Sequence, residues 1–407
     1  MRNILFLIFF CFLISCKPAI EQEARIKEDA TFLASDKLEG RQTGTKGEKA
    51  AAEYIQKRFK ELDLQPKGTT SFLQPFTFKP KTNPHEQVKF DVNGDGTITG
   101  NNVIGFIDNK AENTVIIGAH YDHLGYGGEG SLYRDSIKAI HNGADDNASG
   151  VAVLLNLAAK LKKKNTNNNY LFITFSGEEM GLLGSNYFVK NPTIDTKKVS
   201  YMINMDMVGR LKKDSALAVY GTGTSPIFKQ TLKSHNENFK LIQQESGVGP
   251  SDHTSFYLAD IPVLHFFTGQ HEDYHKPGDD SEKLNYEGME TISNYIFNII
   301  TDLNDNGKLP FRKTKNESEE TPRFKVGMGV IPDYMFDGKG MRIDGISEEK
   351  PAQKAGLKKG DIVIKLGDST VVDMMSYMRA LSVFKKGDKS KVHVKRGKEE
   401  IEKEIQF

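Results

Sequence analysis

Apolar segments with few charged residues recur through the first three quarters of the chain, and segments with helical periodicity separate them. Buried β-strands are expected where the apolar residues are β-branched or aromatic, at residues 114–119, 169–175, 199–205 and 261–267. Amphipathic helices are expected at residues 25–34, 47–62, 151–163 and 286–303. Strands that alternate with helices predict a three-layer α/β/α fold around a mixed, mostly parallel sheet.

A second, smaller domain is expected at the end of the chain, after a polar and charged linker at residues 305–321. Residues 322–407 combine short apolar segments, glycine-rich turns and one helical segment, which indicates a small β-rich domain. The length of 407 residues suits this division. The first domain is expected to span residues 17–304, after a leader at residues 1–16.

The leader has the pattern of a secretory signal, because Arg2 precedes an apolar run at residues 4–14 that is too short for a membrane-spanning helix. The run ends in LISC, which resembles a bacterial lipobox and implies cleavage before Cys16 and lipid attachment to that cysteine. Lys17, rather than Asp, follows the cysteine, which in such lipoproteins usually implies the outer membrane. We therefore expect a lipid-anchored protein of the bacterial cell envelope, facing the periplasm or the surface. A plain secretory signal is the alternative.

The charge balance bears on possible partners, and the cysteine content bears on disulfide bonds. Lys plus Arg number 55 and Asp plus Glu 54, so the overall balance does not indicate nucleic acid as a partner. The two cysteines are Cys11 and Cys16. One would leave with the leader and the other would carry lipid, so we expect no disulfide in the mature chain.

Polar residues that suit a metal site fall at the ends of the predicted strands. They are His120, Asp122, Asp145, Glu178, Glu179, Asp206 and His275. In an open α/β sheet the carboxyl ends of the strands form the ligand-binding edge, so these side chains are expected to converge. Histidines together with carboxylates suit zinc, and a bound cation removes the repulsion between the acids. Taken singly, each residue could equally be a helix cap or a surface charge.

Five segments, in this order, resemble the co-catalytic two-zinc aminopeptidase family. They are GAHYDHLG, NGADDNASGVA, FSGEEMGLLGS, NMDMVGR and YHKPGDD, and LEGRQTGTKG near the start is also typical. The family includes bacterial leucyl aminopeptidases, glutamate carboxypeptidase and, as divergent relatives, glutaminyl cyclases. The resemblance covers residues 25–304.

The resemblance implies two bound Zn²⁺ ions per chain and a role for each matching residue. Asp145 would bridge the two ions. His120 and Asp206 would complete one site, and Glu179 and His275 would complete the other.

The same resemblance implies the residues that act on substrate. Glu178 would be the general base, and Asp122 would orient His120 through its second ring nitrogen. A cis peptide bond between Asp145 and Asp146 is also implied.

The histidines outside the proposed ligand set have different expected roles. His253 lies where relatives often line the substrate pocket, which makes it a candidate for a contact with substrate or transition state. His123 and His141 are expected to be loop residues rather than extra ligands. His265 and His271 are expected to be structural or exposed.

The segment PAQKAGLKKGDIVIKLG resembles a bacterial-type PDZ domain, and the resemblance covers residues 322–407. It implies a sheet edge beside a helix that accepts an extended peptide, with the loop of Gly327, Met328 and Gly329 holding the peptide's C-terminal carboxylate. The alternative is a domain that only docks on the first one.

These observations together predict a membrane-anchored zinc-dependent exopeptidase, an aminopeptidase that acts on peptide N-termini. Alternatives are a carboxypeptidase or dipeptidase of the same family, a glutaminyl cyclase, or a scaffold that binds peptide ends without cleaving them. The intact Glu178 argues against the scaffold.

Overall fold

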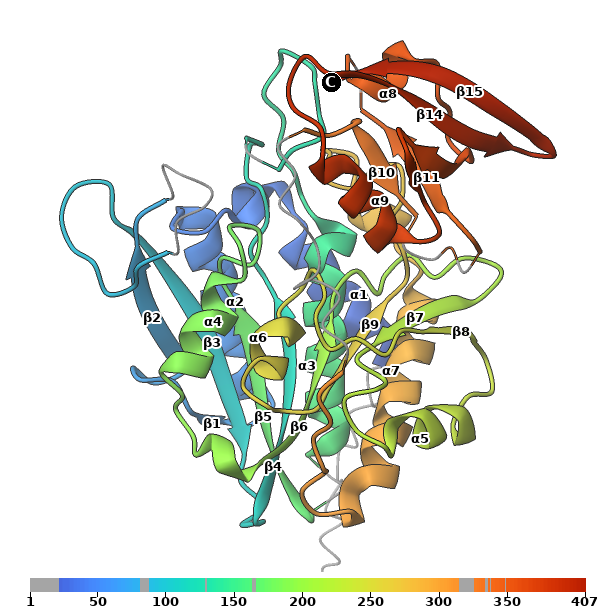
Figure 1. Ribbon diagram of the computed structural model, residues 1–407. Coiled ribbons are helices and arrows are strands. Elements are labelled where there is room, and N and C mark those ends of the chain that lie inside the picture. The colour runs from blue at the N-terminus through green and yellow to red at the C-terminus, as the bar shows by residue number, and fades with distance from the viewer. Residues whose placement is uncertain are drawn as a thin grey trace, which may run out of the picture.

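The computed structural model describes residues 22–80, 88–128, 130–162, 166–314, 326–333, 336, 338–347 and 349–407. Figure 1 shows a large N-terminal domain, coloured blue to yellow-orange, and a small C-terminal domain, coloured orange to red. The predicted leader with Cys16 and the second part of the predicted linker, residues 315–321, lie outside the described residues. None of the helices that the structure describes combines the length and the apolarity needed to cross a bilayer.

The N-terminal domain is built on one nine-stranded sheet within the described chain. Its strands are β1 (Gln65–Pro66), β2 (Leu73–Phe78), β3 (Ile98–Ile107), β4 (Asn113–His120), β5 (Asn168–Phe175), β6 (Val199–Met205), β7 (Ala216–Tyr220), β8 (Lys240–Gln243) and β9 (Val263–Phe267). They are ordered β1-β3-β5-β4-β6-β9-β7-β8, and β2 pairs with β3. The central strands β5, β4, β6 and β9 run parallel, and antiparallel pairs flank them on both sides.

Helices cover both faces of this sheet (Figure 1). One face carries α1 (Gln22–Leu33), α2 (Lys46–Glu61), α3 (Gly150–Leu161), α5 (Phe228–Ser234) and α7 (Tyr286–Asp302). The other face carries α4 (Leu183–Lys190) and α6 (His253–Tyr257). The apolar residues of β4 and β5 point alternately into these two layers, as buried parallel strands do. The predicted three-layer α/β/α fold is confirmed.

The first part of the predicted linker does not leave the N-terminal domain. Leu309 is buried in the core, and the backbone N–H of Arg312 donates to the carbonyl of Thr224. Thr314 bonds the hydroxyl of Tyr257 through its backbone N–H at 3.0 Å. Residues 306–314 therefore belong to the packed domain, because a buried leucine and backbone hydrogen bonds fix them there.

The C-terminal domain has its own core and an antiparallel sheet ordered β10-β11-β12-β14-β15, with β13 paired to β12. Its elements are β10 (Val330–Pro332), β11 (Met341–Ile346), α8 (Pro351–Lys354), β12 (Ile362–Leu366), β13 (Ser369–Thr370), α9 (Met374–Ser382), β14 (Lys389–Arg396) and β15 (Glu399–Gln406). Helix α9 starts at a capping box, in which Asp373 and Ser376 satisfy each other's backbone N–H groups. The predicted β-rich domain with one longer helix is confirmed.

Candidate active site

The ends of the central strands bring the candidate residues to one edge of the sheet. His120 is the last residue of β4, and Asp206 follows β6 directly. Gly177 turns the chain after β5 with a φ of +73°, a left-handed conformation that favours glycine. The next backbone N–H, that of Glu178, donates to Asp122 Oδ1 at 3.1 Å. The sequence therefore fixes both acids of the Glu178–Glu179 pair beside the end of β4.

His120 lies in the first cluster of potential metal ligands. Its Nε2 is 3.3 Å from Asp206 Oδ1 and 3.3 Å from Asp146 Oδ1. Ligand atoms of His120, Glu178 and Asp206 all lie within 4.8 Å of one another. All of these residues except Asp146 were predicted to meet here.

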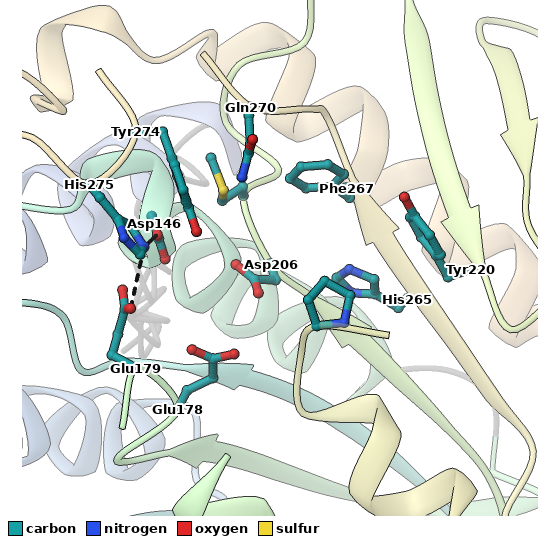
Figure 2. A pocket seen from close by; sticks show the side chains of 12 residues that line it. Asp146, Glu178, Glu179, Asp206, Tyr220, His265, Phe267, Gln270, Tyr274 and His275 are labelled. Carbon is teal, nitrogen blue, oxygen red and sulfur yellow. Dashed lines mark ion pairs between the residues drawn. The ribbon is translucent and has the colours of Figure 1, made fainter. Parts of the chain in front are cut away.

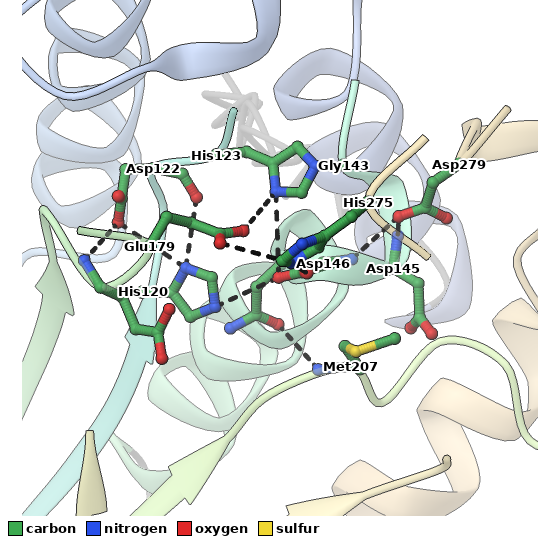
Figure 3. Close-up of polar contacts among 12 residues, drawn as sticks. His120, Asp122, His123, Gly143, Asp145, Asp146, Glu179, Met207, His275 and Asp279 are labelled. Atoms are coloured by element: carbon green, nitrogen blue, oxygen red, sulfur yellow. Dashed lines mark hydrogen bonds and ion pairs between the residues drawn. The ribbon is translucent and has the colours of Figure 1, made fainter. Parts of the chain in front are cut away.

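A second cluster lies on the other side of Asp146 (Figure 3). Asp146 Oδ2 is 3.2 Å from His275 Nε2, which is also 3.3 Å from Glu179 Oε2. His123 Nδ1 lies 2.8 Å from Glu179 Oε1. Because the two oxygens of Asp146 face different clusters, this carboxylate lies where a residue that bridges two ions is needed.

Asp145 was predicted to be the bridging residue, but the structure places the next residue, Asp146, in that position. Its Oδ1 accepts the backbone N–H of Gly209 at 2.6 Å, and its Oδ2 lies 3.2 Å from His271 Nε2. The two adjacent aspartates point in different directions because the backbone at Asp146 is not helical. The cis peptide bond is likewise one residue further along, between Asp146 and Asn147.

Asp122 is buried and connects several parts of the site. It accepts hydrogen bonds from Thr43 Oγ1 at 3.0 Å and from the Glu178 backbone. The second ring nitrogen of His120, Nδ1, lies 3.2 Å from the Asp122 carbonyl oxygen and 3.7 Å from its carboxylate. The residue faces this nitrogen as predicted, and its backbone carbonyl is the nearer group.

The donor set fits two cations that prefer nitrogen and oxygen ligands, as zinc does. Glu179 Oε1 and both ring nitrogens of His123 are buried and make no well-oriented hydrogen bond among the described residues, although Oε1 and Nδ1 lie only 2.8 Å apart. A cation beside these atoms would compensate them. Burial raises the pKa of the Glu178 carboxyl well above its usual range. The charge of His120 lowers this pKa, and the neighbouring Asp206 and Asp252 raise it. A cation held between these groups would favour their ionised forms.

A cavity of about 110 Å³ opens beside the acids. Beyond the acids and His275, its walls combine apolar and aromatic side chains with one histidine and one glutamine: Met207, Tyr220, Pro250, His265, Phe267, Gln270 and Tyr274. Figure 2 shows Glu179 and His275 at one end of this pocket and Tyr220 at the other. A side chain attached to a group held at the acids could therefore enter an apolar pocket.

His265, rather than the predicted His253, lines this pocket. His253 is fully buried, and its ring stacks on that of His265 with centroids 4.4 Å apart. Burial and the charge of His120 lower the pKa of His265 to about 4 while Asp206 raises it, so its ring is neutral near pH 7. The strand register explains this position. His265 pairs with Asn204 on the neighbouring strand, and Asp206 is two residues after Asn204, so His265 and Asp206 face the same side of the sheet.

His123, like His265, lies at the candidate site although the sequence did not predict it there. It was expected to be an ordinary loop residue, but its side chain is completely enclosed and faces Glu179. Its spacing of three residues after His120 could have drawn attention to it. His141 behaves as expected, because its Nε2 pairs with Ser131 in the loop at 2.8 Å.

Comparison with known proteins agrees with this geometry. Residues 102–300 match the profile of peptidase family M28, and residues 311–407 match that of the PDZ domain. A "Probable leucine aminopeptidase" of Trichophyton verrucosum (strain HKI 0517) is 33% identical over 173 residues, which are 40% of this chain and 44% of that protein. The chain spans about half the length of the curated relatives it matches.

Solved structures share the fold. The aminopeptidase from Aneurinibacillus sp. strain AM-1 superposes with a TM-score of 0.54 at 19% identity, over 72% of this chain and 95% of that one. The glutaminyl cyclase of Porphyromonas gingivalis gives a TM-score of 0.54 at 19% identity, over 69% and 98%. Residues 102–300 therefore resemble peptidase family M28, residues 311–407 resemble a PDZ domain, and the first region shares the fold of the solved aminopeptidase.

Proposed function

We propose that the chain is a two-zinc aminopeptidase that removes residues from peptide N-termini. The observation that carries this proposal is the position of Asp146, which presents one oxygen to the cluster of His120 and Asp206 and the other to that of Glu179 and His275. Two clusters that share one carboxylate suit a pair of ions better than a single ion. The names of similar proteins, leucine aminopeptidase and aminopeptidase, support the same activity.

Glu178 is the proposed general base. It lines the pocket and lies beside His120 and Asp206. Bound zinc would supply a Lewis acid that polarises the scissile carbonyl and lowers the pKa of a water molecule. Glu178 takes a proton from the attacking water and delivers it to the leaving amine. Asp122 holds the Glu178 backbone in place for this transfer.

A free N-terminus offers an amine nitrogen, a donor that zinc accepts. The apolar walls of the neighbouring pocket then suit an apolar or aromatic first residue. The nitrogen of an acetylated N-terminus is an amide and a poor metal donor, so an acetylated peptide should bind poorly.

Turnover of free and N-acetylated forms of one peptide set by zinc-replete protein tests the proposal. Release of the first residue from free peptides alone is the expected result. Release of the last residue would instead identify a carboxypeptidase, cyclisation of N-terminal glutamine a glutaminyl cyclase, and binding without turnover a scaffold.

We also propose that the protein is anchored to the cell envelope through lipid on Cys16. The LISC segment and the apolar run before it support this proposal. The wild type should sediment with membranes, and Cys16→Ser should become soluble or stay unprocessed. An identical soluble distribution of both proteins would contradict lipid attachment.

A further inference from the structure

A fully buried arginine lies behind the metal site. Arg41 is the last residue of a short 3₁₀-helical segment, Asp36–Arg41, between α1 and α2, and none of its side chain is exposed. Its guanidinium donates to the carbonyls of Tyr121 at 2.7 Å, Asn142 at 2.7 Å and Gly143 at 2.9 Å, and to that of Leu33. All these bonds end on carbonyl oxygens, so among the residues that the structure describes no carboxylate is hydrogen-bonded to this buried charge.

Removing a guanidinium from water costs free energy, so a buried arginine needs a structural or functional reason. Burial lowers the pKa of Arg41 to about 10, while the charges of Asp122, Asp146 and Asp279 raise it. The guanidinium therefore stays charged at neutral pH. An apolar side chain would fill the space without the cost of burying a charge, but it could not donate hydrogen bonds.

Three of the four carbonyls that Arg41 binds belong to the two loops that carry the proposed metal ligands. Tyr121 lies between His120 and Asp122. Asn142 and Gly143 directly precede the turn at residues 144–149, which contains Asp146. The fourth carbonyl, at the end of α1, is one of those that a helix leaves without an internal partner. One side chain thus joins both ligand loops to a helix.

The backbone around Arg41 is also held in an unusual conformation. Glu39, Gly40 and Arg41 have φ values of 48°, 68° and 48°, all in the left-handed region. A Cβ on Gly40 would meet the carbonyl oxygen of His141 at 2.5 Å and that of Gly125 at 2.6 Å. Such backbone persists where surrounding structure imposes it, and it often marks a functional site. Here it inserts the arginine between the ligand loops.

We propose that Arg41 is a positioning residue that sets the spacing of the two ligand loops, so that the metal site is formed before the cations bind. This inference rests on the proposed zinc site. Residues that orient metal ligands without touching the ion typically change metal affinity by about 10–100-fold when they are replaced. The same change is expected at Arg41.

The variants Arg41→Lys and Arg41→Gln test this role, and Arg58 offers a matched control. Arg58 is also buried, but it pairs with Asp29 of α1 at 2.7 Å and with Glu61 of its own helix α2. Zinc retained against a graded series of chelator concentrations, together with the melting temperature, should be measured for each variant. Arg41 variants should release zinc at about 10–100-fold lower chelator concentration. Arg58→Lys and Arg58→Gln should melt earlier and keep wild-type zinc affinity.

The outcomes separate this inference from the proposed function. A wild-type protein that binds no zinc would refute the proposed function. If the wild type binds zinc and the Arg41 variants bind it with unchanged affinity, the positioning role alone is refuted. Equal loss of zinc in the Arg58 variants would also overturn it, because general destabilisation would then explain both. If Arg41→Gln does not fold, Arg41→Lys carries the test, and failure of both to fold with excess zinc would show a purely structural role.

Discussion

Glu178 and Glu179 are neighbours in sequence but lie in different surroundings. Glu179 faces His275 and His123 through its two oxygens. Glu178 faces the pocket, and its backbone is held by Asp122. One acid is therefore placed to hold a cation and the other to move a proton.

Replacing each acid separately should give different results. Glu178→Gln should keep both zinc ions and lose about 10²–10⁴-fold in kcat, because only proton transfer is removed. Glu179→Ala should lose metal, since its cluster would keep fewer ligands. Elemental analysis and steady-state kinetics on both variants check this. An exchange of the two phenotypes would contradict the assignment of roles.

The stacked pair of His265 and His253 allows another test at the scale of the residue. Phenylalanine at either position keeps the ring stack but removes the polar ring nitrogens. His265→Phe should change the ranking of N-terminal residues among substrates by about tenfold, because only His265 lines the pocket. His253→Phe should leave that ranking within about twofold. A panel of aminoacyl chromogenic substrates gives both results, and equal effects would mean that the stack is only structural.

The sequence located the ligand types well and their exact positions less well. The pattern of polar residues after apolar strands indicated His120, Glu179, Asp206 and His275, and all four take part in the two clusters. Asp146 was missed because two adjacent aspartates are equivalent in pattern, and only the backbone conformation of the turn decides which one faces the site.

At the scale of the secondary-structure element, long apolar strands were predicted from the sequence and short elements were not. Strands β4, β5 and β6 were predicted to within about two residues because buried parallel strands are uninterrupted apolar runs. Elements β7, α5, β8 and α6 were not predicted. They have four to seven residues each, which is too short for a helical or alternating period to show.

The turn after β5 can be tested through its glycine. Gly177→Ala puts a Cβ on a residue with φ +73° and 3.1 Å from the Leu183 side chain. The left-handed backbone alone should cost about 1–2 kcal/mol of folding stability. Because the two glutamates follow directly, kcat should also fall by about tenfold or more.

Gly96 supplies the control for this change. It has φ +77° with open space around its Cβ position, and it lies in the turn before β3. Gly96→Ala should lose similar stability in thermal unfolding and keep full activity. Full activity of Gly177→Ala would show that the turn tolerates displacement.

At the scale of the whole molecule, the two domains share a cavity of about 390 Å³ near the metal site. Tyr133 and Lys276 line it from the first domain, and Ile331 and Ile346 line it from the second. Lys276 follows the proposed ligand His275, and Ile331 lies in β10, the edge strand of the C-terminal sheet. Figure 1 shows β10 and α9 on the side of the C-terminal domain that faces the first domain. A peptide added to β10 would therefore lie close to the peptidase domain.

This arrangement supports the hypothesis that the PDZ domain holds substrate while the metal site trims it. A PDZ groove takes a peptide C-terminus, whereas the proposed peptidase site takes an N-terminus, so holding one end raises the effective concentration of the other. Removal of residues 322–407 should spare turnover of aminoacyl chromogenic substrates and raise KM for longer peptides. C-terminally amidated peptides of the same sequence are the control, since a groove that binds carboxylate should not hold them and the deletion should leave their KM unchanged. Equal loss on all substrates would instead show that the domain stabilises the catalytic fold, and no change on any of them would contradict tethering.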